Sequence, residues 1–450
     1  MYTSKNPYTG EILGTYPFID QRALDQKLER AVKAFGKWRR EPLPGRLGLI
    51  DQLGTLLLDR REELSMEMTA EMGKPITQAL AEIEKCAWLC RYYVENAEDH
   101  LAPRFVDTDA SSSFVRYDPL GPVLAIMPWN YPFCQVFRFA VPALAAGNTA
   151  LVKHAPNVGG CAGRIENLFE EAGFPPGVFQ NLYIAEAQVS DVIASPGIRA
   201  VTLTGSTRAG KAVGALSGEH LKKMVMELGG SNALIVFPDA DLEQTLKTCL
   251  EARFQNTGQS CIAGKRLLLH ADIAAEFSSR LLAGVEKLSC GDPMDPETYI
   301  GVLAREDLAE NLQEQMQKSL KMGAELAFGG SRKGTYFQPT VLLGVTPEMP
   351  VFAEETFGPL LAVATFESEQ AAISLSNQSK FGLGVSIFTK DAERIERMAG
   401  ELEEGAVFVN SLVKSDPRLP FGGIGDSGYG RELSQEGIRE FTNVKTVYIR

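Results

Sequence analysis

The stretch that decides the fold is VLAIM (123–127), followed by a helix-length segment to about residue 146 and then by TALVK (149–153). Two short apolar runs separated by a helix-length segment indicate two parallel β-strands joined by a helix, because parallel strands need a long crossover connection. This stretch therefore predicts an α/β fold built on a doubly wound parallel sheet.

The same alternation continues on both sides of this stretch. Further apolar runs of strand length lie at 178–184, 200–204, 233–237, 265–270 and 406–410. Residues 20–100 have the apolar periodicity of long amphipathic helices, and residues 112–121 resemble a β-ribbon. The last ten residues, FTNVKTVYIR, predict a terminal strand, and such a strand often pairs with another element or another subunit.

Composition limits the partners that the chain can have. A chain of 450 residues that is 44% hydrophobic and 23% charged is expected to form two or three globular units. The formal net charge of −12 argues against a nucleic-acid partner or an anionic membrane surface. The chain has no run of 18 apolar residues, and its polar start lacks a signal-peptide core, so we expect a cytoplasmic protein with no membrane partner.

The cysteines and histidines do not predict a metal site or a disulfide framework. The seven cysteines are an odd number without disulfide-like spacing, no C-x-x-C occurs, and the four histidines lie far apart. Cys86 and Cys90 stand four residues apart in a helical stretch, which favours packing in the core. We therefore expect no bound metal.

One cysteine, Cys261, lies in the glycine-flanked stretch QNTGQSCIAG (255–264). A free cysteine is among the most buried residue types, so this stretch alone favours a buried thiol over a nucleophile. No histidine is near it in sequence. A reactive Cys261 would therefore need a carboxylate base, a cationic cofactor or backbone donors to activate it.

Three loops that adjoin predicted strands carry further candidates. In TGSTRAGKA (204–212), Gly205 and Ser206 open a helix whose N-terminus could meet a pyrophosphate, whereas Ala212 lacks the hydroxyl that an NTPase P-loop needs. The alternative for this loop is an ordinary glycine-rich turn.

The other two loops carry an amide and a carboxylate. Asn130, in MPWNYPF (127–133), could donate to an oxyanion, and Glu227, in MELGGSN (226–232), could act as a general base if burial raises its pKa. A structural turn and a solvated surface carboxylate are the respective alternatives. EETFGP (354–359) is a similar acidic and aromatic cluster.

Taken in order along the whole chain, these motifs resemble those of the aldehyde dehydrogenase superfamily. They are PWN (128–130), KHAP (153–156), TGS (204–206), ELGG (227–230), GQSC (258–261), EETFGP (354–359) and PFGG with GRE (420–432). Glu227 precedes Cys261 by 34 residues, which is the spacing in that family.

The resemblance implies a protomer of three parts and an assembly of several copies. A Rossmann-like dinucleotide-binding domain would comprise residues 1–100 and 120–226, and an α/β catalytic domain would comprise 227–425. A small β oligomerisation flap would comprise 101–119 and 426–450. Homodimers or homotetramers are the implied assemblies.

The resemblance also implies the catalytic roles. Cys261 would attack the aldehyde carbon to form a thiohemiacetal, and Asn130 would stabilise its oxyanion. Loss of hydride would leave a thioester, which Glu227 would hydrolyse by activating water. Glu432 resembles a relay or structural carboxylate near that base.

The implied cofactor is NAD or NADP. The positions that would surround it are Trp129, Lys153, Pro156, Gly205, Ser206, Glu355 and Phe357. Many NAD-preferring members carry a glutamate where this chain has Pro156, so the sequence does not repel a 2′-phosphate; we lean slightly towards NAD.

The closest resemblance within the family is to bacterial succinate-semialdehyde dehydrogenases, some of which share the run VKSDPRLPFGG (413–423). Arg138 lies eight residues after Asn130, about two helical turns, and matches an arginine that holds a substrate carboxylate. Ser415 could supply a hydroxyl to the same carboxylate. A structural ion pair is the alternative for Arg138, and Gln255 replaces a second arginine found in some members.

The expected activity is oxidation of succinic semialdehyde to succinate with NAD or NADP. Glutaric semialdehyde or general aliphatic aldehydes are the alternative substrates, and a non-catalytic nucleotide-binding relative is the alternative of another class. A CoA-acylating enzyme is disfavoured, because such members generally lack the base that Glu227 supplies.

Overall fold

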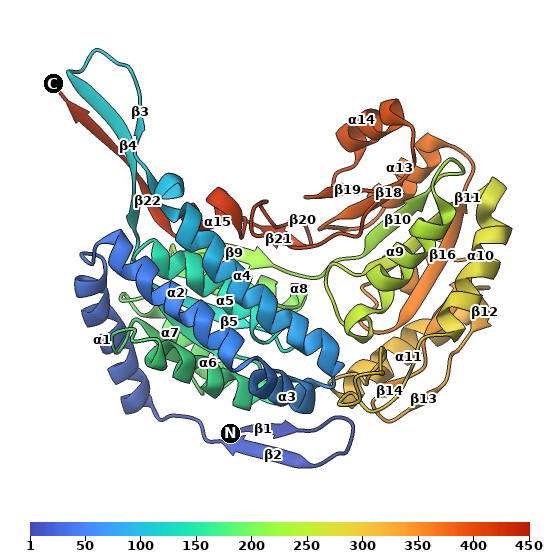
Figure 1. Cartoon of the computed structure of the whole chain (residues 1–450), viewed down its shortest axis with the longest axis horizontal. Coiled ribbons are helices and arrows are strands. Elements are labelled where there is room, and N and C mark those ends of the chain that lie inside the picture. Colours follow the sequence, from blue (N-terminus) through green and yellow to red (C-terminus); the bar gives the residue numbers. More distant parts are fainter.

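The computed structural model describes residues 1–450 as two sheet-centred bodies and a three-stranded sheet that projects from the first body (Figure 1). The strand β9 (Lys223–Glu227) ends in the first body, and the chain then enters the second (Figure 1). An N-terminal hairpin of β1 (Tyr2–Lys5) and β2 (Ile12–Tyr16) lies beside the first body.

The first sheet has six strands, in the order β21-β9-β8-β5-β6-β7. Besides β9 they are β21 (Gly428–Tyr429), β8 (Ala200–Thr204), β5 (Pro122–Met127), β6 (Thr149–His154) and β7 (Phe179–Asn181). All neighbours are parallel except β21, which runs antiparallel to β9 at the edge. The strand–helix–strand prediction for residues 123–153 is confirmed.

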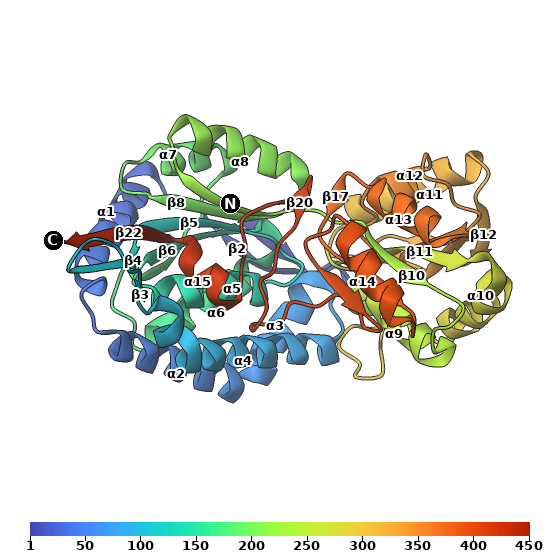
Figure 2. The ribbon, with the colours of Figure 1, turned by 90° about the horizontal axis from the view of Figure 1, so that it is seen from above.

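Helices cover both faces of this sheet (Figure 2). One face packs on α1 (Gln21–Trp38), α7 (Val189–Ala194) and α8 (Thr207–Glu219). The other packs on α2 (Leu43–Asp59), α3 (Arg61–Met72), α4 (Ile76–Leu101), α5 (Cys134–Ala145) and α6 (Gly159–Glu171). Alternate strand residues point to opposite faces, so in β5 Leu124 joins the first core and Val123 and Ala125 join the second.

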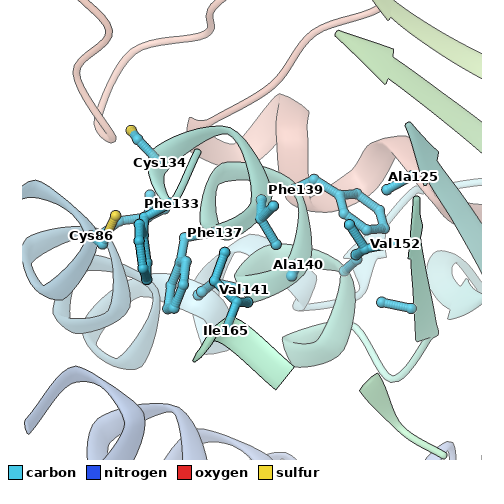
Figure 3. Packing of buried hydrophobic residues seen from close by; sticks show 14 of the residues in the cluster. Cys86, Ala125, Phe133, Cys134, Phe137, Phe139, Ala140, Val141, Val152 and Ile165 are labelled. Carbon is cyan, nitrogen blue, oxygen red and sulfur yellow. The ribbon is translucent and has the colours of Figure 1, made fainter. Parts of the chain in front are cut away.

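The helix α5 is buried along its whole length. Figure 3 shows its Phe139 beside Ala125 and Val152 of the sheet, and Phe133 near Cys86 of α4. Cys86 and Cys90 are both fully buried, as core packing requires. Because α5 is enclosed between the sheet and α4, the residues at its start are held in fixed positions.

The second sheet has seven strands, in the order β12-β15-β16-β11-β10-β18-β19. They are β12 (Glu325–Phe328), β15 (Thr340–Leu343), β16 (Leu360–Phe366), β11 (Gly264–His270), β10 (Asn232–Val236), β18 (Val385–Phe388) and β19 (Val407–Val409). Only the edge strand β12 is antiparallel to its neighbour.

Helices cover both faces of the second sheet as well. One face packs on α9 (Leu242–Phe254) and α10 (Ala271–Glu286). The other packs on α11 (Glu306–Lys321), α12 (Pro350–Ala353), α13 (Glu369–Asn377) and α14 (Ala392–Glu401). Two short hairpins, β13 (Arg332–Lys333) with β14 (Tyr336–Phe337) and β17 (Phe381–Gly382) with β20 (Ile424–Gly425), complete this part.

The projecting sheet has the order β22-β4-β3. Its strands are β22 (Thr442–Ile449), β4 (Ser112–Pro119) and β3 (Arg104–Phe105), and β22 pairs with β4 along its whole length. The C-terminus lies at the tip of this sheet (Figure 1). The terminal strand predicted from the sequence therefore does pair with another element, and its outer edge has no partner within the chain.

The helix α15 (Ser434–Glu440) does not belong to the projecting sheet. It packs against α4 and α5 of the first body. None of the helices combines the length and the apolar character that crossing a bilayer requires.

Candidate active site

The predicted site residues come together because the carboxyl ends of the strands in the first sheet face the amino ends of the strands in the second sheet. Strands β5, β6, β8 and β9 are parallel, so the loops that follow them meet at the carboxyl end of the first sheet. Asn130, Lys153, Ser206 and Glu227 lie at this end. Cys261 lies just before β11, and therefore at the amino end of the strands in the second sheet.

The backbone before Cys261 is held in a rare conformation. Asn256 and Thr257, in the short helical turn 255–258, both have φ near 55°, which is the left-handed region. The Asn256 amide donates to the carbonyls of Asn130 (2.9 Å) and Gln259 (3.1 Å). Strained backbone of this kind persists only where surrounding contacts fix it, and it is concentrated at functional sites.

A buried lysine that the sequence analysis did not single out, Lys265, fixes the other side of the Cys261 loop. Its Nζ donates to the carbonyls of Ser260 (2.8 Å) and Cys261 (2.7 Å) and pairs with Glu355 at 3.3 Å. The side chain of Lys265 is fully buried. The sequence did contain a signal for this residue, because the cationic pair KR stands at the start of an otherwise apolar strand. A lysine buried there requires polar or anionic partners, which here are two carbonyls and a carboxylate.

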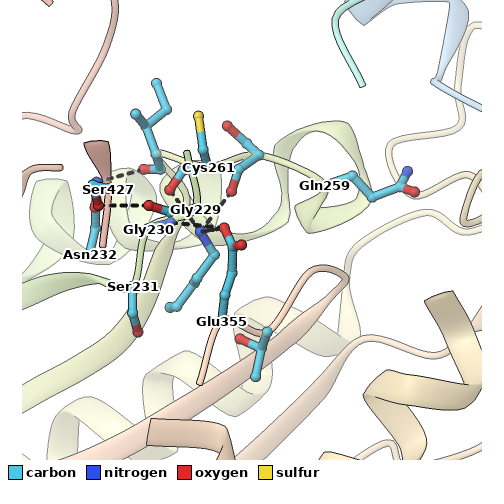
Figure 4. Close-up of polar contacts among 12 residues, drawn as sticks. Gly229, Gly230, Ser231, Asn232, Gln259, Cys261, Glu355 and Ser427 are labelled. Atoms are coloured by element: carbon cyan, nitrogen blue, oxygen red, sulfur yellow. Dashed lines mark hydrogen bonds and ion pairs between the residues drawn. The ribbon is translucent and has the colours of Figure 1, made fainter. Parts of the chain in front are cut away.

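Glu355 links this loop to the chain that leaves β9. Its carboxylate accepts from the backbone N–H of Gly230 at 3.0 Å (Figure 4). A Cβ at Gly230 would lie 2.6 Å from the Cys261 carbonyl oxygen, so only glycine fits there. The ELGG and GQSC motifs are therefore in direct contact.

Residue Cys261 is partly exposed, but the surroundings of its thiol disfavour the charged form. Its pKa is raised to about 11, and burial is the largest cause; Arg138 and Lys265 lower the pKa, and the carboxylates Glu227 and Glu355 raise it. Because only the thiolate is nucleophilic, Cys261 needs a proton acceptor before it can attack at neutral pH.

Glu227 is buried at the end of β9, and neither of its carboxyl oxygens has a hydrogen-bond partner. Burial raises its pKa well above the usual range, and the charge of Glu432 raises it further. Arg138 and Arg431 oppose this shift. A carboxyl group with an elevated pKa and free oxygens is suited to accept and release a proton.

Asn130 and Arg138 lie on either side of the start of α5. The Asn130 side chain is buried, and its Nδ2 donates to the Gln259 carbonyl at 3.1 Å, which leaves its second N–H available. Arg138 is also buried, forms an ion pair with Glu432, and stacks on Phe421 with its Cζ 4.5 Å from the ring centre. The ion pair considered as an alternative for Arg138 is therefore present.

A cavity of about 350 Å³ opens beside Cys261. Its wall includes the predicted residues Cys261, Arg138 and Ser415, and also Gln255, which stands where some family members have a second arginine. The wall also contains polar residues that no sequence motif indicated, among them Lys85, Lys414 and Glu251. The cavity therefore brings together the predicted nucleophile, Cys261, and the two residues predicted to bind the substrate.

Most of the residues expected around the cofactor lie at the carboxyl end of the first sheet, and Glu355 and Phe357 belong to the second body. Trp129 and Phe357 meet edge to face, with ring centres 5.7 Å apart. Ser206 caps α8 and is exposed, as is Pro156, while Gly205 is partly exposed.

These residues fit a dinucleotide. The amine of Lys153 is buried, has no hydrogen-bond or ion-pair partner in the chain, and burial lowers its pKa. An unpartnered cation at the same end of the sheet as an exposed helix N-terminus suits a hydroxyl- and phosphate-bearing ligand.

Two α/β bodies that bring a cysteine and a buried carboxylate together between them have the architecture of an α/β enzyme with its site at the ends of the strands. The chain belongs to the aldehyde dehydrogenase family, whose family model matches residues 1–447. It is an enzyme of that family, which oxidises aldehydes with NAD(P), and the resemblance found in the sequence is confirmed.

Similar proteins with established names cover the whole chain. A probable succinate-semialdehyde dehydrogenase (NADP(+)) of Synechocystis is 46% identical over 447 residues, which is 99% of this chain and 98% of that protein. A succinate semialdehyde dehydrogenase (NAD(P)+) of Escherichia coli is 45% identical over 448 residues, 99% of this chain and 97% of that one. The crystal structure of succinic semialdehyde dehydrogenase from Streptococcus pyogenes with NADP+ has a TM-score of 0.98 at 36% identity and covers both chains fully.

Proposed function

We propose that this chain oxidises succinic semialdehyde to succinate. The observation that carries this proposal is the cavity beside Cys261, whose wall contains cationic and hydroxyl side chains that could hold a terminal carboxylate. The names of the relatives from Synechocystis and Escherichia coli point to the same substrate.

In the proposed mechanism, Cys261 gives its proton to a base and attacks the aldehyde carbon. The second N–H of Asn130 and the backbone N–H of Cys261 stabilise the resulting oxyanion. Lys153, Glu355 and Phe357 would hold the nicotinamide cofactor, which would supply the acceptor for the hydride that leaves this carbon. Glu227 then takes a proton from water, the hydroxide attacks the thioester, and succinate leaves with release of the Cys261 thiolate.

We propose NADP as the preferred cofactor, with NAD also accepted. A carboxylate at position 156 would repel a 2′-phosphate, and Pro156 carries no charge. The sequence slightly favoured NAD as the cofactor, but the names of the relatives do not support that preference, because they specify NADP(+) or NAD(P)+.

We further propose a three-part protomer that assembles through the projecting sheet. The dinucleotide-binding part is centred on the first sheet and the catalytic part, within 227–425, on the second. Because β21 pairs with β9 and α15 packs on α4, we assign residues 426–441 to the first part, which leaves 101–119 and 442–450 as the flap. A homodimer or homotetramer is the proposed assembly.

Steady-state kinetics of the wild-type chain test the substrate and the cofactor together. We expect kcat/KM for succinic semialdehyde to exceed that for butanal by about 10- to 150-fold, which corresponds to one charge-assisted hydrogen bond. Glutaric semialdehyde should fall between them, and NADP should give the higher kcat/KM. Equal values for succinic semialdehyde and butanal would contradict the proposed substrate, and a Cys261→Ser variant supplies the inactive control.

A further inference from the structure

The side chain of Lys85, on α4, occupies a distinctive place in the cavity. It is half-buried and lines both the cavity beside Cys261 and a small adjoining recess of about 10 Å³ that Arg138 also lines. Its Nζ donates to the hydroxyl oxygen of Ser415 at 2.5 Å. No carboxylate of the chain forms an ion pair with it.

The other buried cations near this wall are already neutralised. Arg138 forms its ion pair with Glu432, and Lys74 forms a buried ion pair with Glu82. The second oxygen of Glu82 accepts from the backbone N–H groups of Phe133 and Cys134, so Glu82 is not available to Lys85. Lys85 is thus a cation in the wall without an anion of its own.

We propose that Lys85, together with Ser415, binds the terminal carboxylate of the aldehyde substrate and is the main determinant of specificity for semialdehydes. This inference rests on the proposed function. The ammonium group has three donors, of which Ser415 uses one, and the Ser415 hydroxyl can donate in turn to the second carboxylate oxygen. A carboxylate placed there would supply the missing counter-charge without displacing Glu432 from Arg138.

Replacing Lys85 tests the assignment through the difference between two substrates. Lys85→Met should raise KM for succinic semialdehyde by on the order of 10-fold or more, because it removes a charge-assisted hydrogen bond, and should change KM for butanal far less. Lys85→Arg should restore most of the loss. The matched control is Arg91→Met, which removes a cation from the exposed surface of the same helix.

A chemical probe gives a second readout that does not depend on turnover. Iodoacetate is an anion and iodoacetamide is neutral, and both alkylate a thiolate. The rate with iodoacetate divided by the rate with iodoacetamide, measured at Cys261 by peptide mass spectrometry, should fall in Lys85→Met and stay unchanged in Arg91→Met.

The two proposals fail in different ways. An unchanged alkylation ratio, or equal effects of Lys85→Met on succinic semialdehyde and butanal, would overturn the role of Lys85. A wild-type chain that does not distinguish these aldehydes would overturn the proposed substrate, whatever the alkylation ratio shows.

Discussion

At the scale of single residues, the reactivity of Cys261 depends on the charges around its thiol. Burial raises its pKa to about 11, so the rate of alkylation by iodoacetamide in the absence of nucleotide should rise with pH beyond pH 9. A negative neighbour raises the pKa of a thiol, and Glu227 is such a neighbour. Glu227→Gln should therefore shift the alkylation profile to lower pH, by on the order of half a pH unit to one unit.

The measurement is the alkylation rate at Cys261 between pH 6 and pH 11, read by peptide mass spectrometry. Glu62→Gln removes an exposed carboxylate from α3 and is the control for the change in net charge. A profile that stays in place or moves to higher pH in Glu227→Gln would contradict the electrostatic coupling of the two residues.

At the scale of elements, one buried ion pair fixes the start of α5, the helix that carries Arg138. Lys74 and Glu82 pair in the interior, and the Lys74 amine also lies 3.9 Å from the ring centre of Tyr131. Glu82→Gln leaves the Lys74 charge buried without a partner, which should cost about 3–5 kcal/mol of folding free energy. Combining it with Lys74→Met removes both charges and should recover most of that loss.

Thermal unfolding of the two single variants and the double variant measures this coupling as a double-mutant cycle. Glutamine at position 82 keeps an oxygen that can accept from the N-terminal N–H groups of α5, so the cycle isolates the charges from the cap. Additive losses in the double variant would show that the charges of Lys74 and Glu82 do not stabilise each other.

The elements were more predictable than the contacts between their side chains. The apolar runs at 123–127 and 149–153 are observed as β5 and β6, because strand periodicity is a local property. The convergence of Cys261 and Glu227 required the family resemblance, since nothing local in either motif names the other. Lys265 with Glu355 and Lys85 with Ser415 are separated by 90 and 330 residues in sequence, so these pairings appear only once the sheets are assembled.

At the scale of the whole molecule, the outer edge of β22 and the apolar side chains beside it favour assembly. β22 is an edge strand of eight residues, and its Val444 and Ile449 are exposed together with Phe105 of β3. A long, apolar, unpaired edge is a site for strand pairing with another copy.

We expect the wild-type chain to form a dimer or tetramer, and the double variant Val444→Asp/Ile449→Asp to shift it towards the monomer. Light scattering after size-exclusion chromatography measures the mass, with Ile12→Asp as the control at another exposed isoleucine, on β2. A wild-type mass of about 49 kDa, that of one chain, would contradict assembly, and an unchanged mass in the double variant would place the interface elsewhere.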